Sequence, residues 1–323
     1  MKVAFIVNDF DYINLDKDTS IYLIHEGLNR KHEVEVLNIS DVSFKDNEVF
    51  GLCKKIDFPD KDSLDFSLGK PENRNLRNFD FVVNRVTPPF NKEYLYLTLL
   101  LELKNIKCIN STKSLRENNE KLSILNFQNL IPKTLVTNSF DNIRNFLINE
   151  CEKIVLKPLD GMGGKSIFVV NKGDKNLNVI WENITDNGRK HVMAQEYVKD
   201  SDLGDNRLVY INYQLLSKKV VRIPSDEDFR GNLAVGAKSI VKDITEFDEE
   251  VSKQIIPYLK DNSIYFAGVD FLGRKLSEIN LTSPTCLQEI HRGSSLNPGK
   301  IFWEGLESVS YTHLTLPTTR CGV

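Results

Sequence analysis

The sequence has few cysteines, no long apolar run and no excess of basic residues. Its five cysteines stand far apart, as Cys53, Cys108, Cys151, Cys286 and Cys321. Neither the close cysteine pairs of a zinc site nor the pattern of a disulfide-linked domain is present, which fits a reducing compartment, and we expect the cytoplasm. The formal net charge of -3 argues against a broad basic surface, so we expect no nucleic-acid partner.

The sequence also lacks signals for a membrane or for secretion. Because no run of about 18 apolar residues is present, we predict no transmembrane helix and no membrane partner. The chain starts with an apolar stretch typical of a strand, Lys2–Val7, which is too short and too soon followed by polar residues for a signal peptide. The 323 residues, 41% of them hydrophobic and 27% charged, are enough for two or three domains with their own cores.

Residues 1–117 alternate strand-like and helix-like segments, separated by a long polar stretch at 45–78 that we interpret as a loop. The order of the segments predicts a mostly parallel sheet. Arg85 follows one strand and could hold a substrate carboxylate in a bidentate contact, although a solvated arginine is an equally good interpretation. The predicted segments are strand Lys2–Val7, a helix capped by Thr19 or Ser20, strand 34–37, strand 79–84, helix Lys92–Leu103 and strand 107–109.

A glycine-rich loop, K-P-L-D-G-M-G-G at 157–164, lies between two apolar runs that are typical of a hairpin. Three of its last four residues are glycine, so backbone N–H groups can approach an anion closely, and Lys157 adds an ammonium group. A strand follows the glycines, whereas a Walker A loop or a Rossmann dinucleotide loop opens a helix. We therefore predict a flap over a polyphosphate, and an ordinary surface hairpin is the alternative.

The segments around this loop predict a compact α+β lid at 118–190. A polar stretch at 225–237 contains Arg230 and two glycines, and it is either a mobile loop that closes over the site or plain surface. The predicted segments are helix 118–127, strand Thr134–Thr137, a helix from Ser139 to 147, strands 154–157 and 167–170, helix 174–186, strand 193–198 and helix 248–259.

Two predicted strands near the C-terminus, 263–271 and 276–281, alternate apolar and polar residues. If a three-residue G-R-K loop joins them, Asp270 lies opposite Glu278, and Asn280 shares their face. Two carboxylates and an amide oxygen suit Mg²⁺ that is held partly by phosphates. A solvated strand with ordinary charges is the alternative, but the T-S-P-T sequence that follows is a poor continuation of such a strand.

Four motifs occur in chain order: K-P-L-D-G-M-G-G, then M-A-Q-E-Y-V, then R-I-P followed by F-R-G-N-L-A-V-G, then E-I-N-L-T-S-P-T-C. Together they resemble the motifs of bacterial-type glutathione synthetases, which are ATP-grasp ligases. The likeness runs from residue 1 to 306 and includes N-E-K-L at 119–122 and P-P-F at 88–90. It implies an α/β and α+β fold, with a Rossmann-like (pre-ATP-grasp) substrate-binding domain at 1–117 and a two-part ATP-grasp fold, whose lid is 118–190 and whose C-terminal domain is 191–307.

The resemblance implies roles for individual residues. Those that would contact ATP are Lys121, Lys157, Asp160, Gly161, Gly163, Gly164, Gln195, Glu196, Tyr197, Val198 and Asp205. Those that would hold Mg²⁺ or Mn²⁺ are Asp270, Glu278 and Asn280. The catalytic arginines would be Arg207, Arg222 and Arg230, and the residues that would contact the peptide substrate are Arg85, Ser283 and Thr285.

The implied reaction joins γ-glutamylcysteine and glycine through an acyl phosphate and gives glutathione, ADP and phosphate. The resemblance also implies a homo-oligomer, a dimer or a tetramer. Two other functions stay open, namely a sibling ATP-grasp ligase for another acid and amine, and a non-catalytic ATP-binding protein. The chain departs from the family at Thr87, Asn206 and Lys238. Residues 308–323 show no family likeness, and we interpret them as a tail that arose by read-through or a sequencing error.

Overall fold

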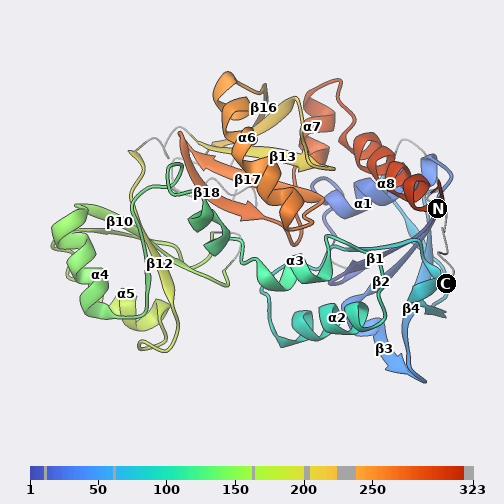
Figure 1. The fold of residues 1–323 in the computed structure, drawn as a ribbon, viewed down its shortest axis with the longest axis horizontal. Coiled ribbons are helices and arrows are strands. Elements are labelled where there is room, and N and C mark those ends of the chain that lie inside the picture. The colour runs from blue at the N-terminus through green and yellow to red at the C-terminus, as the bar shows by residue number, and fades with distance from the viewer. Residues whose placement is uncertain (11–12, 61–62, 162–163, 200–203, 224–237, 316–323) are drawn as a thin grey trace, which may run out of the picture.

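The chain forms three β-sheets with helices on their faces (Figure 1). The computed structural model describes residues 1–10, 13–60, 63–161, 164–199, 204–223 and 238–315, and at 238 and 309–315 it describes the backbone only. The first sheet is built from the N-terminal residues, the second lies in the lid, and the third lies in the C-terminal domain.

The N-terminal sheet has a parallel centre, as predicted, in which β2, β1, β7 and β8 are parallel neighbours. The central strand β1 is buried on both faces, which explains its continuous apolar sequence. Its residue Phe5 shares a core with α1, and its residue Ile6 shares another core with α2. The elements are β1 (Lys2–Val7), α1 (Thr19–Asn29), β2 (Glu33–Asn38), β7 (Phe81–Asn84), α2 (Lys92–Leu103), β8 (Cys108–Ile109) and α3 (Thr112–Glu117).

The stretch 45–78 contains strands, so its interpretation as a long loop is wrong. The strand β4 pairs antiparallel with β2, β3, β5 and β6. Val49 and Cys53 of β4 are buried, while Leu52 is 45% exposed on the opposite face. Apolar residues on both faces hide the alternation that marks a half-buried strand in a sequence. These elements are β3 (Val42–Lys45), β4 (Glu48–Asp57), β5 (Ser67–Leu68) and β6 (Glu72–Asn75).

Two predicted helices begin differently in the structure. The N-cap of α1 is Asp18, not Thr19 or Ser20, because its side chain accepts a hydrogen bond from the N–H of Ile21 at 2.9 Å. The predicted helix 118–127 is only a short 3₁₀ helix, Leu122–Asn126. Its first residues are diverted because the Asn119 side chain accepts the N–H groups of residues 121 and 122, both at 3.0 Å.

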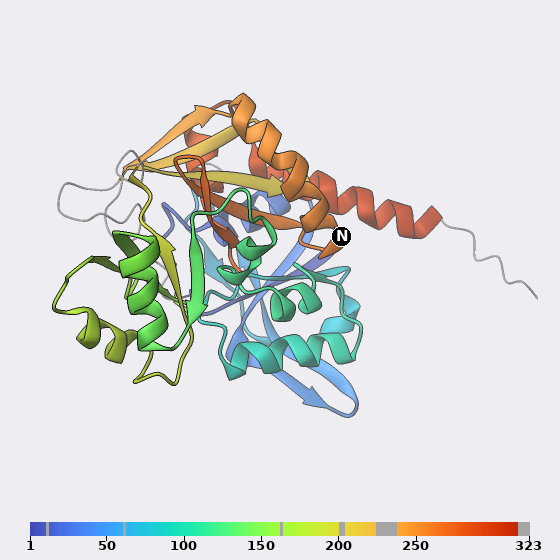
Figure 2. The same ribbon diagram turned by 60° about the vertical axis from the view of Figure 1, so that its left-hand side comes forward.

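The lid has an antiparallel sheet of its own, with the strand order β11-β10-β12-β9. Ser139 caps α4 as predicted, and the glycine-rich loop joins β10 to β11 as a hairpin. The lid also has a core of its own and stands beside the rest of the molecule (Figure 2). Its elements are β9 (Thr134–Thr137), α4 (Phe140–Asn145) with a π-helical turn (Phe146–Glu150), β10 (Lys153–Pro158), β11 (Phe168–Asn171), α5 (Leu177–Ile184) and β12 (Val192–Glu196), so the sheet extends past residue 190.

The C-terminal sheet is antiparallel, with the order β16-β15-β13-β17-β18 and with β14 paired to β13. Helix α6 packs on the face that includes Tyr210, and α8 packs on the face that includes Ile211. Helix α8 runs to Thr315, past residue 308, where the sequence loses its family likeness. The elements are β13 (Asp205–Ile211), β14 (Gln214–Leu215), β15 (Lys218–Ile223), β16 (Lys238–Asp243), α6 (Glu246–Asp261), β17 (Phe266–Leu272), β18 (Lys275–Asn280), α7 (Leu287–Gly293) and α8 (Pro298–Thr315).

The hairpin of β17 and β18 has a two-residue turn, so the predicted three-residue G-R-K loop is wrong. The predicted pairing of Asp270 with Glu278 is nevertheless correct, because the register shifts by one residue between Asp270 and Phe271. Ser277 is the extra residue of this β-bulge. The pairs across the hairpin are Leu272 with Lys275, Phe271 with Leu276, Asp270 with Glu278, Val269 with Ile279 and Gly268 with Asn280.

The N-terminal and C-terminal domains share both of their large cores. Asn110, which is 3% exposed, forms hydrogen bonds between the two domains where they meet. Its amide group donates hydrogen bonds to the carbonyl oxygens of Phe266 (2.8 Å) and Leu281 (2.6 Å), and its oxygen accepts the N–H of Phe266 (2.8 Å). Buried polar groups that are paired in this way fix one relative orientation of the two domains.

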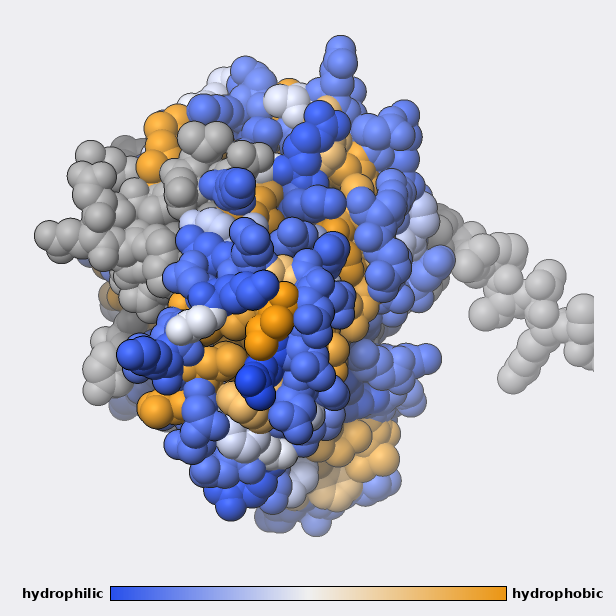
Figure 3. All heavy atoms as spheres, turned by 90° about the vertical axis from the view of Figure 1, so that its left-hand side faces the viewer, coloured by the Kyte–Doolittle hydropathy of each residue, from blue (hydrophilic) through white to orange (hydrophobic). Residues whose placement is uncertain are grey.

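The surface seen from the lid side is mostly hydrophilic, with apolar side chains in small groups (Figure 3). A more apolar surface lies on α2, where Tyr96, Leu99 and Leu103 are 51%, 45% and 62% exposed. The opposite side of α2 is buried, so this helix is apolar nearly all round. None of the helices in the described parts of the chain is both long and apolar enough to cross a lipid bilayer.

Candidate active site

A cavity of about 630 Å³ lies where the three parts of the molecule meet. The lid contributes Lys157 and Gln195, the C-terminal sheet contributes Arg207 and Asp270, and the loop after β1 contributes Lys17. A volume of this size is typical of a site for small molecules. The cavity therefore brings together segments that lie far apart in the sequence.

Most of the site residues expected from the sequence line this one cavity. They are Lys121, Lys157, Gly161, Gly164, Gln195, Glu196, Tyr197, Val198, Asp205, Arg207, Arg222, Asp270, Glu278, Asn280, Ser283 and Thr285.

Of the other four expected residues, two lie outside the described residues and two do not line the cavity. Gly163 and Arg230 lie outside the described residues, as does the loop 225–237. Asp160 is exposed and does not contribute to the cavity wall. Arg85 is 3% exposed and also lies outside the wall, where its guanidinium donates hydrogen bonds to Ser20 Oγ (3.1 Å) and to the carbonyl oxygen of Pro284 (2.7 Å). Arg85 thus joins two segments of the fold and is not solvated at a strand end.

Two buried arginines flank one carboxylate at the wall of the cavity. Asp270 accepts hydrogen bonds from Arg207 Nε (2.8 Å) and Nη2 (2.7 Å) and from Arg222 Nη2 (2.8 Å). Burial alone would raise the pKa of Asp270, but the two guanidinium groups outweigh it and hold this pKa well below its usual range. The carboxylate is therefore ionised and keeps both arginines in fixed positions.

Both arginines make a second contact. Arg207 Nη1 donates a hydrogen bond to Thr285 Oγ1 at 2.9 Å, and Arg222 Nη2 is paired with the carboxylate of Asp205. Burial raises the pKa of Asp205 to about 7, although Arg222 opposes this shift. The resemblance assigns Asp205 to the ribose of ATP. In the structure, however, its carboxylate is paired with Arg222.

Lys157 is buried at the end of β10, where the flap begins. Its Nζ donates hydrogen bonds to Gln195 Oε1 (2.8 Å) and to Ser277 Oγ (3.1 Å). Burial lowers the pKa of Lys157 to about 8, and the charge of Glu278 offsets only part of this effect. An anion in the cavity would favour the charged form of this lysine.

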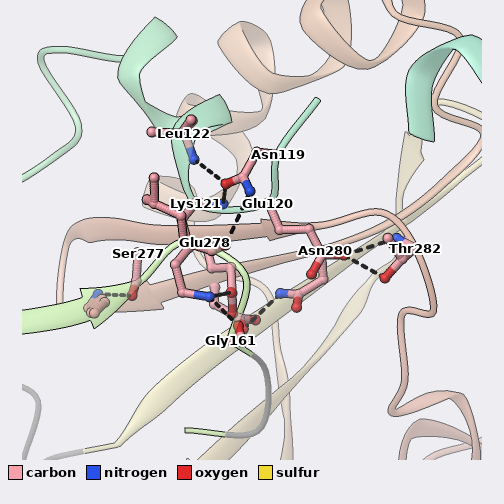
Figure 4. Close-up of polar contacts among 12 residues, drawn as sticks. Asn119, Glu120, Lys121, Leu122, Gly161, Ser277, Glu278, Asn280 and Thr282 are labelled. Carbon is pink, nitrogen blue, oxygen red and sulfur yellow. Dashed lines mark hydrogen bonds and ion pairs between the residues drawn. The ribbon is translucent and has the colours of Figure 1, made fainter. Parts of the chain in front are cut away.

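Lys121 joins the flap to β18 (Figure 4). Its Nζ forms an ion pair with Glu278 Oε1 at 3.1 Å and donates a hydrogen bond to the carbonyl oxygen of Gly161. Asn119 reaches the same flap, since its Nδ2 donates a hydrogen bond to the carbonyl oxygen of Leu159 at 3.1 Å. Two buried lysines and two buried arginines thus face one cavity, which suits the negative charge of a polyphosphate.

The oxygen atoms in the site fit a divalent cation that is also bound by phosphate. Both oxygens of Asp270 accept hydrogen bonds from arginine, so a cation would share this carboxylate with the two guanidinium groups. Glu278 lines the cavity, and the amide nitrogen of Asn280 donates to Asp270 at 3.1 Å, which leaves the amide oxygen of Asn280 as an acceptor. Within the described residues no group of three or more His, Cys, Asp or Glu side chains could form a metal site alone. Mg²⁺ typically takes one or two carboxylates and completes its shell with phosphate and water.

Glu120, Ser277 and Glu289 also line the cavity and were missed in the sequence analysis. Glu120 belongs to the N-E-K-L motif, and this motif could have indicated it as a site residue. Ser277 could not be found, because its place depends on the β-bulge. Glu289 is 8% exposed, and burial raises its pKa.

Comparison with known proteins gives two family matches that together span most of the chain. Residues 1–116 match the family "Prokaryotic glutathione synthetase, N-terminal domain", and residues 120–295 match "Prokaryotic glutathione synthetase, ATP-grasp domain". A glutathione synthetase of Buchnera aphidicola subsp. Schizaphis graminum is 33% identical over 314 residues, which cover 96% of this chain and 98% of that protein. A glutathione synthetase of Nitrosomonas europaea is 36% identical over 313 residues, with coverage of 95% and 98%.

Solved structures with low sequence identity share the fold. A D-cycloserine synthetase has a TM-score of 0.68 and 16% identity, over 95% of this chain and 99% of that one. D-alanyl-alanine synthetase A from Vibrio cholerae has a TM-score of 0.62 and 14% identity, over 96% and 98% of the two chains. The predicted arrangement of an N-terminal domain followed by an ATP-grasp domain is therefore confirmed.

Proposed function

Since the chain belongs to the prokaryotic glutathione synthetase family and is an ATP-grasp ligase, we propose that it joins γ-glutamylcysteine to glycine and forms glutathione, ADP and phosphate. The observation that carries this proposal is the convergence of two buried lysines and two buried arginines on one cavity. ATP brings a polyphosphate to this cavity, and the acid substrate becomes an acyl phosphate there. Both species need fixed positive charge in a site with little water.

ATP binds between the lid and the C-terminal sheet in this proposal. The backbone of 196–198 contacts the edge of the adenine, and Asp205 contacts the ribose once its pairing with Arg222 is rearranged. Lys121 and Lys157 contact the phosphates, and the N–H groups of the flap cover them. The wall residues Lys157, Gln195 and Tyr197 support this arrangement, because they lie together along the lid side of the cavity.

Arg207 and Arg222 hold the reacting groups in the acyl-transfer steps. The cysteinyl carboxylate of the acid attacks the γ-phosphorus of ATP, and the bond to ADP breaks. The glycine amine then attacks the acyl carbon, and phosphate leaves with the former carboxylate oxygen. Because Asp270 fixes both guanidinium groups before substrate arrives, their charge needs little reorganisation during the reaction.

The divalent cation would be held by Asp270, Glu278 and Asn280, and we propose Mg²⁺ with Mn²⁺ as a substitute. A bound cation would neutralise phosphate charge and orient the γ-phosphate. Asp270 also positions Asn280 and the two arginines through hydrogen bonds. Ser283 and Thr285 contact the peptide substrate from the loop after β18.

The enzyme is proposed to work in the cytoplasm as a homo-oligomer. Cys53, Cys108, Cys151 and Cys286 are free thiols in the described residues, which fits a reducing compartment. The exposed apolar side of α2 supports a contact between copies of the chain, because a large apolar patch on a surface commonly marks an interface. Light scattering of the purified protein at several concentrations tests whether it is a dimer or a tetramer.

Product analysis tests the proposed function. The protein is incubated with ATP, Mg²⁺, γ-glutamylcysteine and glycine, and the thiol products are separated and identified by mass. We expect one glutathione for each phosphate released. Equal turnover with unrelated acids and amines would favour a sibling ligase, and tight ATP binding with no product from any pair would favour a binding protein.

A further inference from the structure

We propose that Glu120 is a positioning residue, whose carboxylate fixes the bend that leads from Asn280 to the substrate-binding loop at 283–285. Glu120 lines the cavity and precedes Lys121, yet none of the steps described above uses its side chain. The inference rests on the proposed substrates, because it concerns how the acid substrate is held.

One oxygen of Glu120 accepts three hydrogen bonds from the bend, and Figure 4 shows those from Thr282. Its Oε1 accepts the N–H of Leu281 at 2.9 Å, the N–H of Thr282 at 3.0 Å and the hydroxyl group of Thr282 at 2.8 Å. The main-chain oxygen of Glu120 also accepts the N–H of Ile279 at 2.9 Å. Since three hydrogen bonds meet at one side-chain oxygen and a fourth at the main-chain oxygen, Glu120 defines the path of the backbone at the bend.

The bend lies between two groups that must be placed accurately. On one side is Asn280, which lies in the proposed cation site, and on the other side are Ser283 and Thr285. Thr285 accepts a hydrogen bond from Arg207, so a displaced bend would also disturb this arginine. Misplacement by about 1 Å can lower a reaction rate 100-fold.

Glu120 acts on the substrate loop, whereas its two neighbours act on the flap. Asn119 bonds to the flap at Leu159, and Lys121 bonds to the flap at Gly161. Removal of the Glu120 side chain leaves these contacts in place. We therefore expect removal of the Glu120 side chain to weaken binding of the acid substrate and to change ATP binding little.

Three variants test the role of Glu120: Glu120→Ala, Glu120→Gln and Thr282→Val. We expect Glu120→Ala to lower kcat/KM for γ-glutamylcysteine by roughly tenfold or more, with KM for ATP changed less than about threefold. Glu120→Gln keeps an oxygen at the same place and should restore kcat/KM to within about threefold of the unmodified protein. Thr282→Val removes the hydroxyl donor and should give a smaller fall in the same direction.

A matched control separates positioning from loss of stability. Glu35 is a buried glutamate, 5% exposed, that pairs with Lys2 (3.6 Å) and Arg74 (3.3 Å) in the N-terminal sheet, away from the cavity. Glu35→Ala should lower the melting temperature and leave KM for the acid unchanged. If Glu120→Ala does not fold, Glu120→Gln and Thr282→Val still allow the comparison.

Three results would overturn the proposal: an unchanged kcat/KM for the acid in Glu120→Ala or in Thr282→Val, an equal rise of KM for ATP and for the acid, or no recovery in Glu120→Gln. If the unmodified chain made no glutathione but joined another acid and amine, the proposed function would fail instead. The same variants, compared with that substrate pair, would still decide the role of Glu120.

Discussion

Asp270 lies directly opposite Glu278 in the ladder of β17 and β18, and a β-bulge at Ser277 makes this pairing possible. In a regular hairpin with the same two-residue turn, Asp270 would face Ser277, and Glu278 would point to the core side. The bulge also directs Ser277 Oγ to Lys157, at 3.1 Å. One extra residue thus brings Glu278 to the arginine-bound face and adds a contact to the lysine below the flap.

Deletion of Ser277 should keep Asp270 opposite Glu278, because it removes the extra residue of the bulge and leaves the pairs on both sides unchanged. The variant loses the hydrogen bond from Lys157 to Ser277 Oγ, so it should keep activity within about tenfold. Ser277→Ala is the matched control, because it keeps the bulge and removes the same hydrogen bond. Phosphate release and thermal unfolding should be measured for both. A deletion variant that folds but is far less active than Ser277→Ala would show that the bulge itself is required.

Glu278→Gln should lower activity far more than stability. Its side chain is 24% exposed and pairs with Lys121, and a glutamine at this place can still accept a hydrogen bond from that lysine. The amount of Mg²⁺ needed for half-maximal rate should rise by roughly tenfold or more, because a neutral amide binds a hard cation poorly. Glu250→Gln removes an exposed glutamate that pairs with Lys253 and is the control. An unchanged Mg²⁺ requirement in Glu278→Gln would remove Glu278 from the cation site.

ATP affinity should depend on pH through Lys157. Since burial lowers the pKa of Lys157 to about 8, the lysine loses its charge as the pH rises through 8, and ATP binding should weaken by up to about tenfold per pH unit above that value. The free energy of unfolding shows the opposite trend, because the buried charge of Lys157 destabilises the folded state below pH 8. This destabilisation disappears as the pH rises from 8 to 10.5, the usual pKa of a lysine. Titration calorimetry between pH 7 and 9 measures the first effect. Lys157→Met should bind ATP weakly, and its affinity should lack this decline; an identical decline would show that another group causes it.

Asp270→Asn should destabilise the fold strongly. The change leaves Arg207 and Arg222 buried with less compensating charge, and breaking a buried ion pair costs about 3–5 kcal/mol in the free energy of unfolding. Since the pKa of Asp270 is held well below its usual range of about 4, its stabilising effect is present above that pH and is lost as the pH falls below it. Chemical denaturation at pH 7 and at lower pH measures both effects. A loss of less than 1 kcal/mol at pH 7 would contradict the account of the arginine pair.

Local sequence patterns predicted the parts of the fold that depend on local structure. Lys2–Val7, Lys92–Leu103 and Thr134–Thr137 have the predicted bounds, because each has a clear apolar period or a flanking cap. The strand β4 was missed, since Phe50 and Leu52 make its outer face apolar as well. A three-residue turn was predicted for the β17–β18 hairpin because the bulge leaves no mark in the sequence.

The candidate site was predicted mainly from motifs whose residues converge only in the fold. Lys157, Arg207 and Glu278 belong to such motifs and line the cavity, whereas Arg85 packs behind it. Sequence reasoning could not show that Asp270 accepts hydrogen bonds from two arginines, since these contacts depend on the alignment of the antiparallel strands β13, β15 and β17. It also could not reveal the three hydrogen bonds to Glu120, because their donors are backbone and hydroxyl groups about 160 residues away in the chain.

Transfer of oxygen from the acid substrate to phosphate tests the central claim most directly. γ-Glutamylcysteine labelled with ¹⁸O in both oxygens of its cysteinyl carboxylate is incubated with ATP, Mg²⁺ and glycine, and the phosphate and glutathione are analysed by mass. If an acyl phosphate forms and glycine displaces its phosphate, each phosphate should carry one ¹⁸O, the new amide should keep the other, and the two products should form in equal amounts. Unlabelled phosphate, or phosphate released at the same rate without glycine, would contradict the account.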